Sequence, residues 1–423
     1  MHSNISSHFD SHNVLNNAQH GFRKKRSCIS QLIITLNDFA DCLKSKQQID
    51  AILLDFSKAF DKVDHEGLIL KLEHLGVRDS LLAWIRSFLI GRNQKVLVDG
   101  VSSDPKPVLS GVPQGTVLGP LLFLVYINDI SDGLSKGSQI NLFADDGLLY
   151  RTINNIKDSE ALQTDLNLLQ KWEKEWKMEF HPQKCQLLRV SNKQNKILYN
   201  YKIHNIPIIE TSSAKYLGVL IDSNLSWKSQ YNYVNKKANH VLSLLKRNFH
   251  FCSTSVKSKC YTTLIRPIVD YGCEVWDPHF QTDIDFIEKI QKRAARFATN
   301  NYCMESGNSS KNLSSLNWDT LETRRSKIKL TTFQNARLEN IYIPLSHLKH
   351  NSSRTRAGGN GLTYSREFSP VDGHIYSFFP SVTRLWNQLP TEVKSCNDVD
   401  SSKININNID IASLKSKAYP HKY

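Results

Sequence analysis

Several stretches of the chain place apolar residues three or four positions apart, which is the spacing of one face of an amphipathic helix. One such stripe consists of Ile29, Leu32, Ile33, Leu36, Phe39, Ala40 and Leu43, and a second of Val234, Ala238, Val241, Leu242 and Leu245. Asp64 is a good helix cap, and Gly76 a good stop, for a helix that ends at Leu75. Further helical patterns span residues 80–89, 118–130, 159–176 and 284–297.

Short apolar runs between these helices predict β-strands. Ala51–Phe56 reads as a buried strand that ends in a carboxylate, and Lys95–Val101 alternates like a hairpin strand. Two runs, Ile140–Ala144 and Leu148–Tyr150, enclose Asp145-Asp146-Gly147, the pattern of a β-hairpin with a tight turn. Further strands are expected at 187–190 and 216–221, so strands and helices are mixed along the chain.

The amino-acid composition indicates a globular protein with an excess of basic residues. The 423 residues are 40% hydrophobic, which is enough for a core of two to three packed units. Lys and Arg outnumber Asp and Glu by 54 to 40, a formal charge of +14, and this favours a polyanionic partner such as nucleic acid. Charge alone also fits an ordinary basic protein. Between Lys193 and Lys259 eleven basic residues face only Glu210 and Asp222.

Cysteine spacing and the first residues bear on location. The eight cysteines form no close pair of the zinc-binding kind, and reduced thiols in an intracellular protein are expected. The start of the chain lacks the apolar core of a signal peptide, and no apolar run reaches the ~18 residues of a membrane span. We therefore predict a nuclear or cytoplasmic protein that is not secreted and has no membrane partner.

Asp55 and the pair Asp145-Asp146 are the strongest candidates for chemistry. Phosphoryl transfer to a nucleotide needs divalent metal ions, and paired carboxylates on rigid strands hold such ions. If the two strands are neighbours, like charges ~4 Å apart repel by roughly 4 kcal/mol at an effective dielectric constant of 20, so a cation or a proton is needed there. Taken alone, Asp-Asp-Gly is also an ordinary hairpin turn.

Three ordered blocks resemble motifs A, B and C of reverse transcriptases. They are ILLDFSKAFDKVDH at Ile52–His65, SGVPQGTVLGPLLFLVYINDI at Ser110–Ile130 and LFADDGLLY at Leu142–Tyr150. QHGFR at Gln19–Arg23 resembles the preceding fingers block, and Phe180–Leu188 and Lys215–Asp222 resemble later palm blocks. The residues within these motifs are similar to those of non-LTR (LINE-type) retrotransposons of the jockey or CR1 kind. The similarity extends to about Val393.

This resemblance implies an RNA-directed DNA polymerase with an RNA template, a DNA primer and dNTPs as partners. It makes Asp55, Asp145 and Asp146 the catalytic ligands of two Mg²⁺ ions, or of Mn²⁺, with the Phe56 carbonyl as a further ligand. It also makes Phe60 the bulky residue that excludes a ribose 2′-hydroxyl. Simple core packing is the alternative for Phe60.

Other nucleotide contacts are implied in the same way. Gln114 and Gly115 match the turn that lies against the incoming nucleotide, although a plain helix-entry turn reads the same. Arg23 would donate to the nucleotide phosphates, while Arg23–Arg26 also fits a nuclear import signal. Lys184 would assist the departure of pyrophosphate. The family usually has Asn where this chain has His181, which leaves the role of that loop open.

Nucleic-acid contacts are expected further along the chain. Leu217 and Gly218 fall in the block that holds the primer end. One helix carries four cations that would bind the phosphate backbone of the duplex, as in a polymerase thumb. They are Lys236, Lys237, Lys246 and Arg247. A solvated helix face is the alternative reading.

The resemblance predicts an α+β fold, a right-hand polymerase whose palm is an antiparallel sheet backed by helices. Its parts would be partial fingers at 1–50, the palm at 51–222, a basic helical thumb at 223–300 and a C-terminal extension of unknown role at 301–423. Full-length elements of this kind carry an endonuclease and the first fingers blocks before the QHGFR block, which only 18 residues precede here. The chain is therefore expected to be N-terminally truncated.

Two functions follow, an active reverse transcriptase and a catalytically inactive relic that only binds nucleic acid. Intact Asp55, Asp145 and Asp146 favour the first. A third reading, an RNA-dependent RNA polymerase, is disfavoured by Phe60 and by the length of the match. Metal-dependent primer extension separates the first two.

Overall fold

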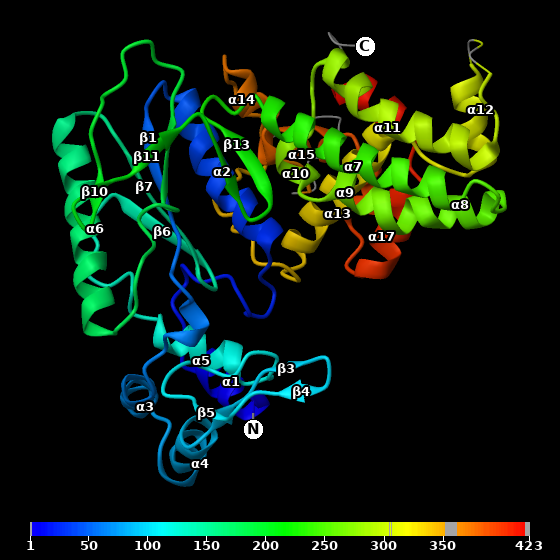
Figure 1. The fold of residues 1–423 in the computed structure, drawn as a ribbon. Helices are drawn as coiled ribbons and strands as arrows, with labels where there is room; N and C mark the ends of the chain where they lie inside the picture. The colour runs from blue at the N-terminus through cyan, green and yellow to red at the C-terminus, as the bar shows by residue number, and fades with distance from the viewer. Residues whose placement is uncertain (1, 304, 306, 352–361, 419–423) are drawn as a thin grey trace. The chain divides into compact units, whose positions relative to one another are not determined.

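The computed structural model describes residues 2–303, 305, 307–351 and 362–418. They form two compact units, which are described separately. The first unit comprises residues 1–28 and 47–212, and the second comprises 29–46 and 213–423. The chain thus leaves the first unit after Cys28, returns to it at Gln47 and leaves again after Ser212. Figure 1 shows the elements of both units.

The first unit is built around one β-sheet with helices. Its strands lie in the order β11-β8-β1-β7-β6, so β1 is the central strand. The elements are α1 (His2–Ser11), β1 (Ile49–Leu54), η1 (Ala59–Asp61), α3 (His65–His74), α4 (Asp79–Leu89), β2 (Asn93–Gln94), β3 (Leu97–Val98), β4 (Val101–Ser102), β5 (Lys106–Pro107), α5 (Gly119–Tyr126), β6 (Ser138–Phe143), β7 (Asp146–Thr152), α6 (Ile156–Glu175), β8 (Gln186–Val190), β9 (Lys202–Ile203), β10 (Ile206–Pro207) and β11 (Ile209–Thr211).

The prediction of a purely antiparallel sheet was wrong at one edge. β1 pairs antiparallel with β7 and with β8, and β6 pairs antiparallel with β7, but β11 runs parallel to β8. The reason is the connection: residues 191–208 form a long link that includes the β9–β10 ribbon, which lets the chain re-enter the sheet in the same direction. The central sheet is therefore mixed.

Local helix signals were read correctly in this unit. The Asp64 carboxylate accepts a hydrogen bond from the Gly67 amide at the start of α3, and Gly76 takes a positive φ of 87° after its end. α5, expected to be a largely buried helix, is buried at every position except Pro120. Its apolar side chains fill the core between the sheet and α3.

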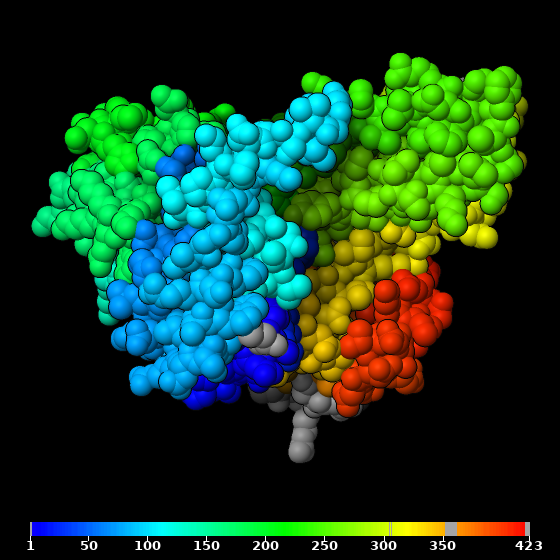
Figure 2. Space-filling view, turned by 60° about the horizontal axis from the view of Figure 1, so that its bottom comes forward, coloured from blue at the N-terminus to red at the C-terminus, as the bar shows by residue number. Residues whose placement is uncertain are grey.

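The region predicted as one strand at Lys95–Val101 is instead a turn between two short strands. Asp99 and Gly100 adopt positive φ angles of 49° and 84°, which reverse the chain between β3 and β4. This ribbon stands out from its unit as the cyan projection at the top of Figure 2. Its side chains Val96, Leu97, Val98 and Val101 are exposed.

The second unit is mainly helical. It begins with α2 (Cys28–Lys44), whose Gln31 amide donates to the Tyr216 hydroxyl over 2.5 Å. The remaining elements are β12 (Ser213–Tyr216), β13 (Val219–Asp222), α7 (Lys228–Asn248), α8 (Thr254–Cys260), the π-helix η2 (Tyr261–Ile265), α9 (Arg266–Asp270), α10 (Cys273–Trp276), α11 (Gln281–Thr299), α12 (Asn308–Ser315), α13 (Leu321–Arg337), α14 (Asp372–Ile375), α15 (Phe378–Asn387), α16 (Thr391–Lys394), α17 (Val399–Asn407) and α18 (Ile411–Ala418).

The apolar stripe predicted for 29–43 is the face of α2 that this unit buries. Ile33, Leu36 and Ala40 line a small cleft with Leu225 and Phe378 of the same unit. α2 precedes motif A in the sequence, yet the residues that line this cleft with it lie between Leu225 and Phe378. No described helix is both long and apolar enough to cross a lipid bilayer.

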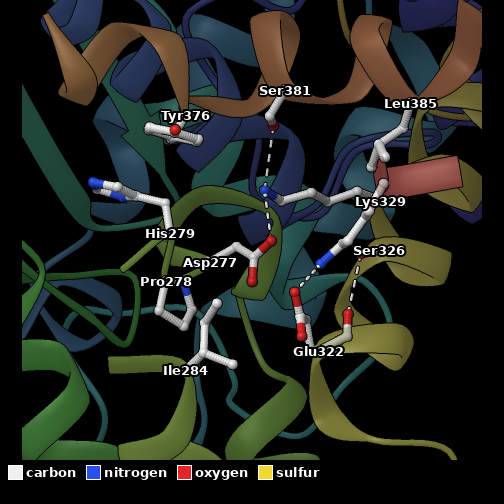
Figure 3. A pocket seen from close by; sticks show the side chains of 11 residues that line it. Asp277, Pro278, His279, Ile284, Glu322, Ser326, Lys329, Tyr376, Ser381 and Leu385 are labelled. Carbon is white, nitrogen blue, oxygen red and sulfur yellow. Dashed lines mark hydrogen bonds and ion pairs between the residues drawn. The ribbon is translucent and has the colours of Figure 1, made fainter. Parts of the chain in front are cut away.

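A buried group of charges joins three helices of the second unit (Figure 3). The Asp277 carboxylate pairs with Arg325 Nε at 2.6 Å and with Lys329 Nζ at 3.0 Å. Lys329 also contacts Ser381 of α15, and Lys415 of α18 pairs with Glu322 of α13. Burial alone would raise the pKa of Asp277, but Lys329 and Arg325 outweigh it and hold that pKa well below its usual range.

This ion group predicts an acid-sensitive contribution to stability. Because the pKa of Asp277 is depressed in the folded state, the contribution is complete above the ordinary carboxylate pKa of about 3.9 and is lost as pH falls below it. Asp277→Ala leaves Arg325 and Lys329 buried without their partner, so urea denaturation is expected to show a loss of about 3–5 kcal/mol at neutral pH. The control is Arg86→Ala, which breaks the exposed pair with Glu66 and should cost at most about 1 kcal/mol.

Candidate active site

The register of β1 and β7 brings the predicted carboxylates together. Leu54 lies opposite Gly147 in this antiparallel pair. The next residues along the two strands, Asp55 and Asp146, are therefore neighbours at the same end of the sheet. Asp145 lies in the hairpin turn that leads into β7. The structure thus places Asp55 beside the Asp145-Asp146 pair, as the three motifs predict.

These three carboxyl groups repel one another electrostatically. Burial raises the pKa of Asp145 and of Asp146, and the negative charge of Asp55 raises both further. Asp145 itself adds to the rise at Asp146. The Oδ2 atom of Asp55 is buried and accepts no hydrogen bond. The three carboxyl groups therefore favour additional positive charge, which either a cation or a proton can supply.

The hairpin turn lies earlier than the sequence suggested. Phe143 pairs with Asp146, so the turn consists of Ala144 and Asp145, and Asp146 and Gly147 belong to β7. Ala144, not glycine, takes the positive φ of 54° that the reversal needs. Gly147 serves another purpose, because a Cβ there would lie 3.3 Å from the Leu54 side chain of the central strand.

Gln19 fixes this turn from a distant part of the chain. Its side-chain oxygen accepts hydrogen bonds from the Ala144 and Gly21 amides at 2.9 and 2.7 Å, and its Nε2 donates to the Ala144 carbonyl at 3.3 Å. Residues 18–20 also pair with Leu142 on the outer edge of β6. A Cβ on Gly21 would come within 2.3 Å of the Ala144 nitrogen, so only glycine fits there.

The loop of motif B is bonded to the end of motif A. The Val112 amide donates to the Phe60 carbonyl at 2.9 Å, and Gln114 Nε2 donates to the Asp61 carboxylate at 2.9 Å. Gly111 has a φ of 89°, and a Cβ there would lie 2.8 Å from the Asp61 backbone. A backbone bond at Val112 and a side-chain bond at Gln114 thus hold the motif B loop against Phe60 and Asp61.

Phe60 packs on the core, and its predicted role in excluding a ribose 2′-hydroxyl stays a prediction. Its half-buried ring stacks on Phe123 of α5, with centroids 4.2 Å apart, and meets the exposed Phe22 edge-on at 6.3 Å. One side of the ring thus packs on the core while part of it stays accessible. Gly115 has a φ of 76° and open space where a Cβ would stand, which leaves room at this turn.

Lys184 is the one cation that approaches Asp55 among the described ion pairs. Lys184 Nζ lies 3.7 Å from the unbonded Asp55 Oδ2, too far for a hydrogen bond. The His181 amide donates to the Asp55 carbonyl at 2.8 Å, on the side of β8. Because carbonyls alternate along an extended strand, the carbonyl of Phe56 points to the other side, where β7 lies.

Arg23 forms a hydrogen bond within its own N-terminal segment. One guanidinium nitrogen donates to the Asn16 carbonyl at 2.7 Å. The predicted contact with nucleotide phosphates stays a prediction. Lys24 and Lys25 are exposed, and their reading as part of an import signal is likewise untested.

The remaining predicted residues belong to the second unit. Leu217 and Gly218 form the turn between β12 and β13, with positive φ angles of 44° and 84°, and the Tyr271 hydroxyl donates to the Leu217 carbonyl. The four predicted cations all lie on α7. Lys236, Lys237 and Arg247 are exposed, and Lys246 is half-buried. The first unit therefore groups the carboxylates, Phe60, Gln114 and Lys184, while the hairpin and the cations of α7 form a separate set.

The carboxylates supply the kind of ligand that a divalent cation needs, but they do not form a complete metal site by themselves. Within the part of the chain that the structure describes, no three His, Cys, Asp or Glu side chains form a ready-made metal site. The donors at this edge are oxygen atoms, which hard cations such as Mg²⁺ prefer. The unbonded Asp55 oxygen and the raised pKa values of Asp145 and Asp146 mark where positive charge is missing.

Gly21→Ala is expected to disturb the turn that carries Asp145. The added methyl group has no space beside the Ala144 amide, and overpacking of this kind costs about 1–3 kcal/mol. Thermal denaturation should show this loss. The control is Gly373→Ala, where the new Cβ would meet only ordinary contacts at 3.7 Å and beyond. Equal stability of the two variants would contradict the close approach.

Known proteins resemble the chain in sequence. It is 29% identical over 298 residues to the probable RNA-directed DNA polymerase from transposon X-element of Drosophila melanogaster, covering 66% of this chain and 32% of that protein. It is also 29% identical over 290 residues to the RNA-directed DNA polymerase from mobile element jockey of Drosophila funebris, covering 66% and 31%. The chain thus spans about a third of the length of these relatives.

A solved structure of telomerase from Candida albicans, in complex with a fragment of telomeric RNA, aligns over 97% of this chain and 58% of that chain. The sequence identity is 12% and the TM-score 0.44. The reverse transcriptase (RNA-dependent DNA polymerase) family matches residues 1–221, which include all three carboxylates. The chain therefore belongs to the reverse transcriptase family, and its relatives confirm the resemblance to non-LTR retrotransposons.

Proposed function

We propose that this chain copies an RNA template into DNA, as the polymerase part of a non-LTR retrotransposon. The reaction joins a dNTP to the 3′-hydroxyl of a DNA primer and releases pyrophosphate. The observation that carries the proposal is the position of Asp55 beside Asp145 and Asp146 at the end of the β1–β7 pair. Membership of the reverse transcriptase family supports it.

Divalent metal ions, two Mg²⁺ or Mn²⁺ in this proposal, would be held by Asp55, Asp145, Asp146 and the Phe56 carbonyl. When bound, such ions activate the primer hydroxyl and neutralise the charge of the leaving phosphate. The carboxylates bring the negative charge that attracts the ions. Their raised pKa values mean that the site binds protons in competition with cations, so affinity for the metal should rise with pH.

The other residues of the first unit would position the nucleotide. Lys184 lies on the Asp55 side of the site, where its ammonium group would meet the pyrophosphate. Gln114 and Gly115 would lie along the nucleotide, and the accessible part of the Phe60 ring would meet the sugar. Arg23 would contact the phosphates after giving up its bond to the Asn16 carbonyl.

The second unit would bind the primer and the template duplex. Leu217 and Gly218 would hold the primer end, and Lys236, Lys237, Lys246 and Arg247 would follow the phosphate backbone. In this proposal α7 is the thumb, and the sheet of the first unit with its covering helices is the palm of a right-hand polymerase. Residues 1–50 would belong to the fingers.

The first test is extension of a DNA primer on an RNA template with dNTPs and Mg²⁺. The unchanged chain should extend the primer, and Asp145→Ala with Asp146→Ala should reduce extension to background, because the metal ligands are lost. Chelation of the metal by EDTA should do the same. If the unchanged chain binds the primer–template but never extends it, the polymerase proposal fails and the chain only binds nucleic acid.

Sugar selection tests the role of Phe60 separately. Phe60→Ala should lower the preference for dNTPs over rNTPs by about 10- to 100-fold, since a pocket that loses one steric group discriminates by that much less. Single-nucleotide incorporation with each nucleotide type measures the ratio. Phe123→Leu is the matched control, because it disturbs the same stack from the core side. A core role alone would lower stability in both variants and leave the ratio unchanged.

A further inference from the structure

The turn that joins α7 to α8 in the second unit exposes an aromatic side chain. Phe251 is 93% exposed. It lies against the ring of His250, with centroids 3.8 Å apart and the planes tilted by 40°. The His250 ring is in turn within 3.2 Å of the Arg247 carbonyl at the end of α7. Burying a phenylalanine side chain stabilises a folded protein by about 1.5–3 kcal/mol. The exposed Phe251 ring contributes none of this free energy to the folding of its own unit.

Positive charge surrounds this turn. The sequence between Asp222 and Asp270 contains no acidic residue and eight lysines and arginines, listed in order as Lys228, Lys236, Lys237, Lys246, Arg247, Lys257, Lys259 and Arg266. Lys257 is buried, whereas Lys228, Lys236, Lys237, Arg247 and Lys259 are exposed on α7 and α8, which are yellow-green at the upper right of Figure 2. A polyanion is therefore the partner that this surface attracts.

A second helix, α11, contacts α7 and α8 through side chains that carry positive charge. Arg293 of α11 donates to the Asn239 side chain of α7, and Lys257 of α8 reaches Asn300 just after α11. Lys246 is half-buried in the last turn of α7. Burial lowers the pKa of Lys246, and the charges of Arg293 and Arg296 lower it further. Lys246, Arg293 and Arg296 thus repel one another, and a phosphate bound among them would reduce this repulsion.

We infer that the α7–α8 turn binds single-stranded nucleic acid, with an unpaired base stacked on Phe251 and the neighbouring phosphates on Lys246, Arg293 and Arg296. Exposed aromatic rings within basic surfaces bind single strands in this way, since every base has a face that can stack. The bases of a duplex are already stacked on one another and cannot use the ring. This site goes beyond the proposed polymerase reaction and needs none of its carboxylates.

The test measures binding of the full chain to three fluorescent ligands by anisotropy, without dNTPs. The ligands are a single-stranded RNA of about a dozen nucleotides, an abasic strand with the same number of phosphates, and a duplex of the same length. Phe251→Ala is compared with Phe368→Ala, which removes another ring that is 88% exposed but stands next to Glu367. Both variants should unfold at the temperature of the unchanged chain, because neither ring is buried.

Phe251→Ala should weaken binding of the RNA strand about tenfold and leave the abasic strand and the duplex unchanged. Phe368→Ala should change none of the three. Arg293→Gln and Arg296→Gln should weaken binding of both single strands and lower the slope of log K against log salt by about 0.7 for each cation removed. Together these results establish a stacking site flanked by phosphate contacts.

Equal binding of the RNA by Phe251→Ala and the unchanged chain overturns the inference. So does an equal loss on the abasic strand, which would reduce the turn to a charge contact. If sedimentation shows that Phe251→Ala abolishes self-association instead, the ring belongs to a protein interface. These binding measurements use neither a primer nor dNTPs, so their outcome does not depend on polymerase activity.

Discussion

The central strand β1 pairs with β7 on one side and with β8 on the other, and Leu54 lies opposite Gly147. A shift of one residue in this register would turn the side chains of a strand to the opposite face of the sheet. Because the register holds, Asp55 meets the Asp145-Asp146 pair. Gly147 preserves it by letting the Leu54 side chain approach the backbone of β7. The pairing on the other side places Lys184 near Asp55.

Patterns within one element allowed much of the fold to be predicted. The apolar stripe of α2, the Asp64 cap of α3 and the buried helix α5 depend on neighbours in the sequence, and all three were read correctly. The parallel edge strand β11 was missed because three residues carry no direction signal. The place of the turn before Asp146 was also missed, since an alanine with positive φ is rare and glycine was the natural choice.

The candidate site could likewise be predicted only in part from the sequence. The motifs pointed to Asp55, Asp145, Asp146, Phe60 and Gln114, and the structure brings these residues into one unit. The importance of Gln19 and Gly21 was not visible, although both lie in the recognised QHGFR block. Their contacts with Ala144 join positions more than 120 residues apart, and they are made with backbone atoms, which leave no trace in the pattern of side chains.

The position of α2 has a consequence for how the chain is made on the ribosome. This helix is synthesised early, but the residues that cover its apolar face, among them Leu225 and Phe378, come roughly 190 to 340 residues later. At about 5–20 residues per second, the helix waits on the order of ten seconds to a minute for its partners. During that interval the apolar stripe of α2 is exposed, and chaperones that bind apolar segments can occupy it.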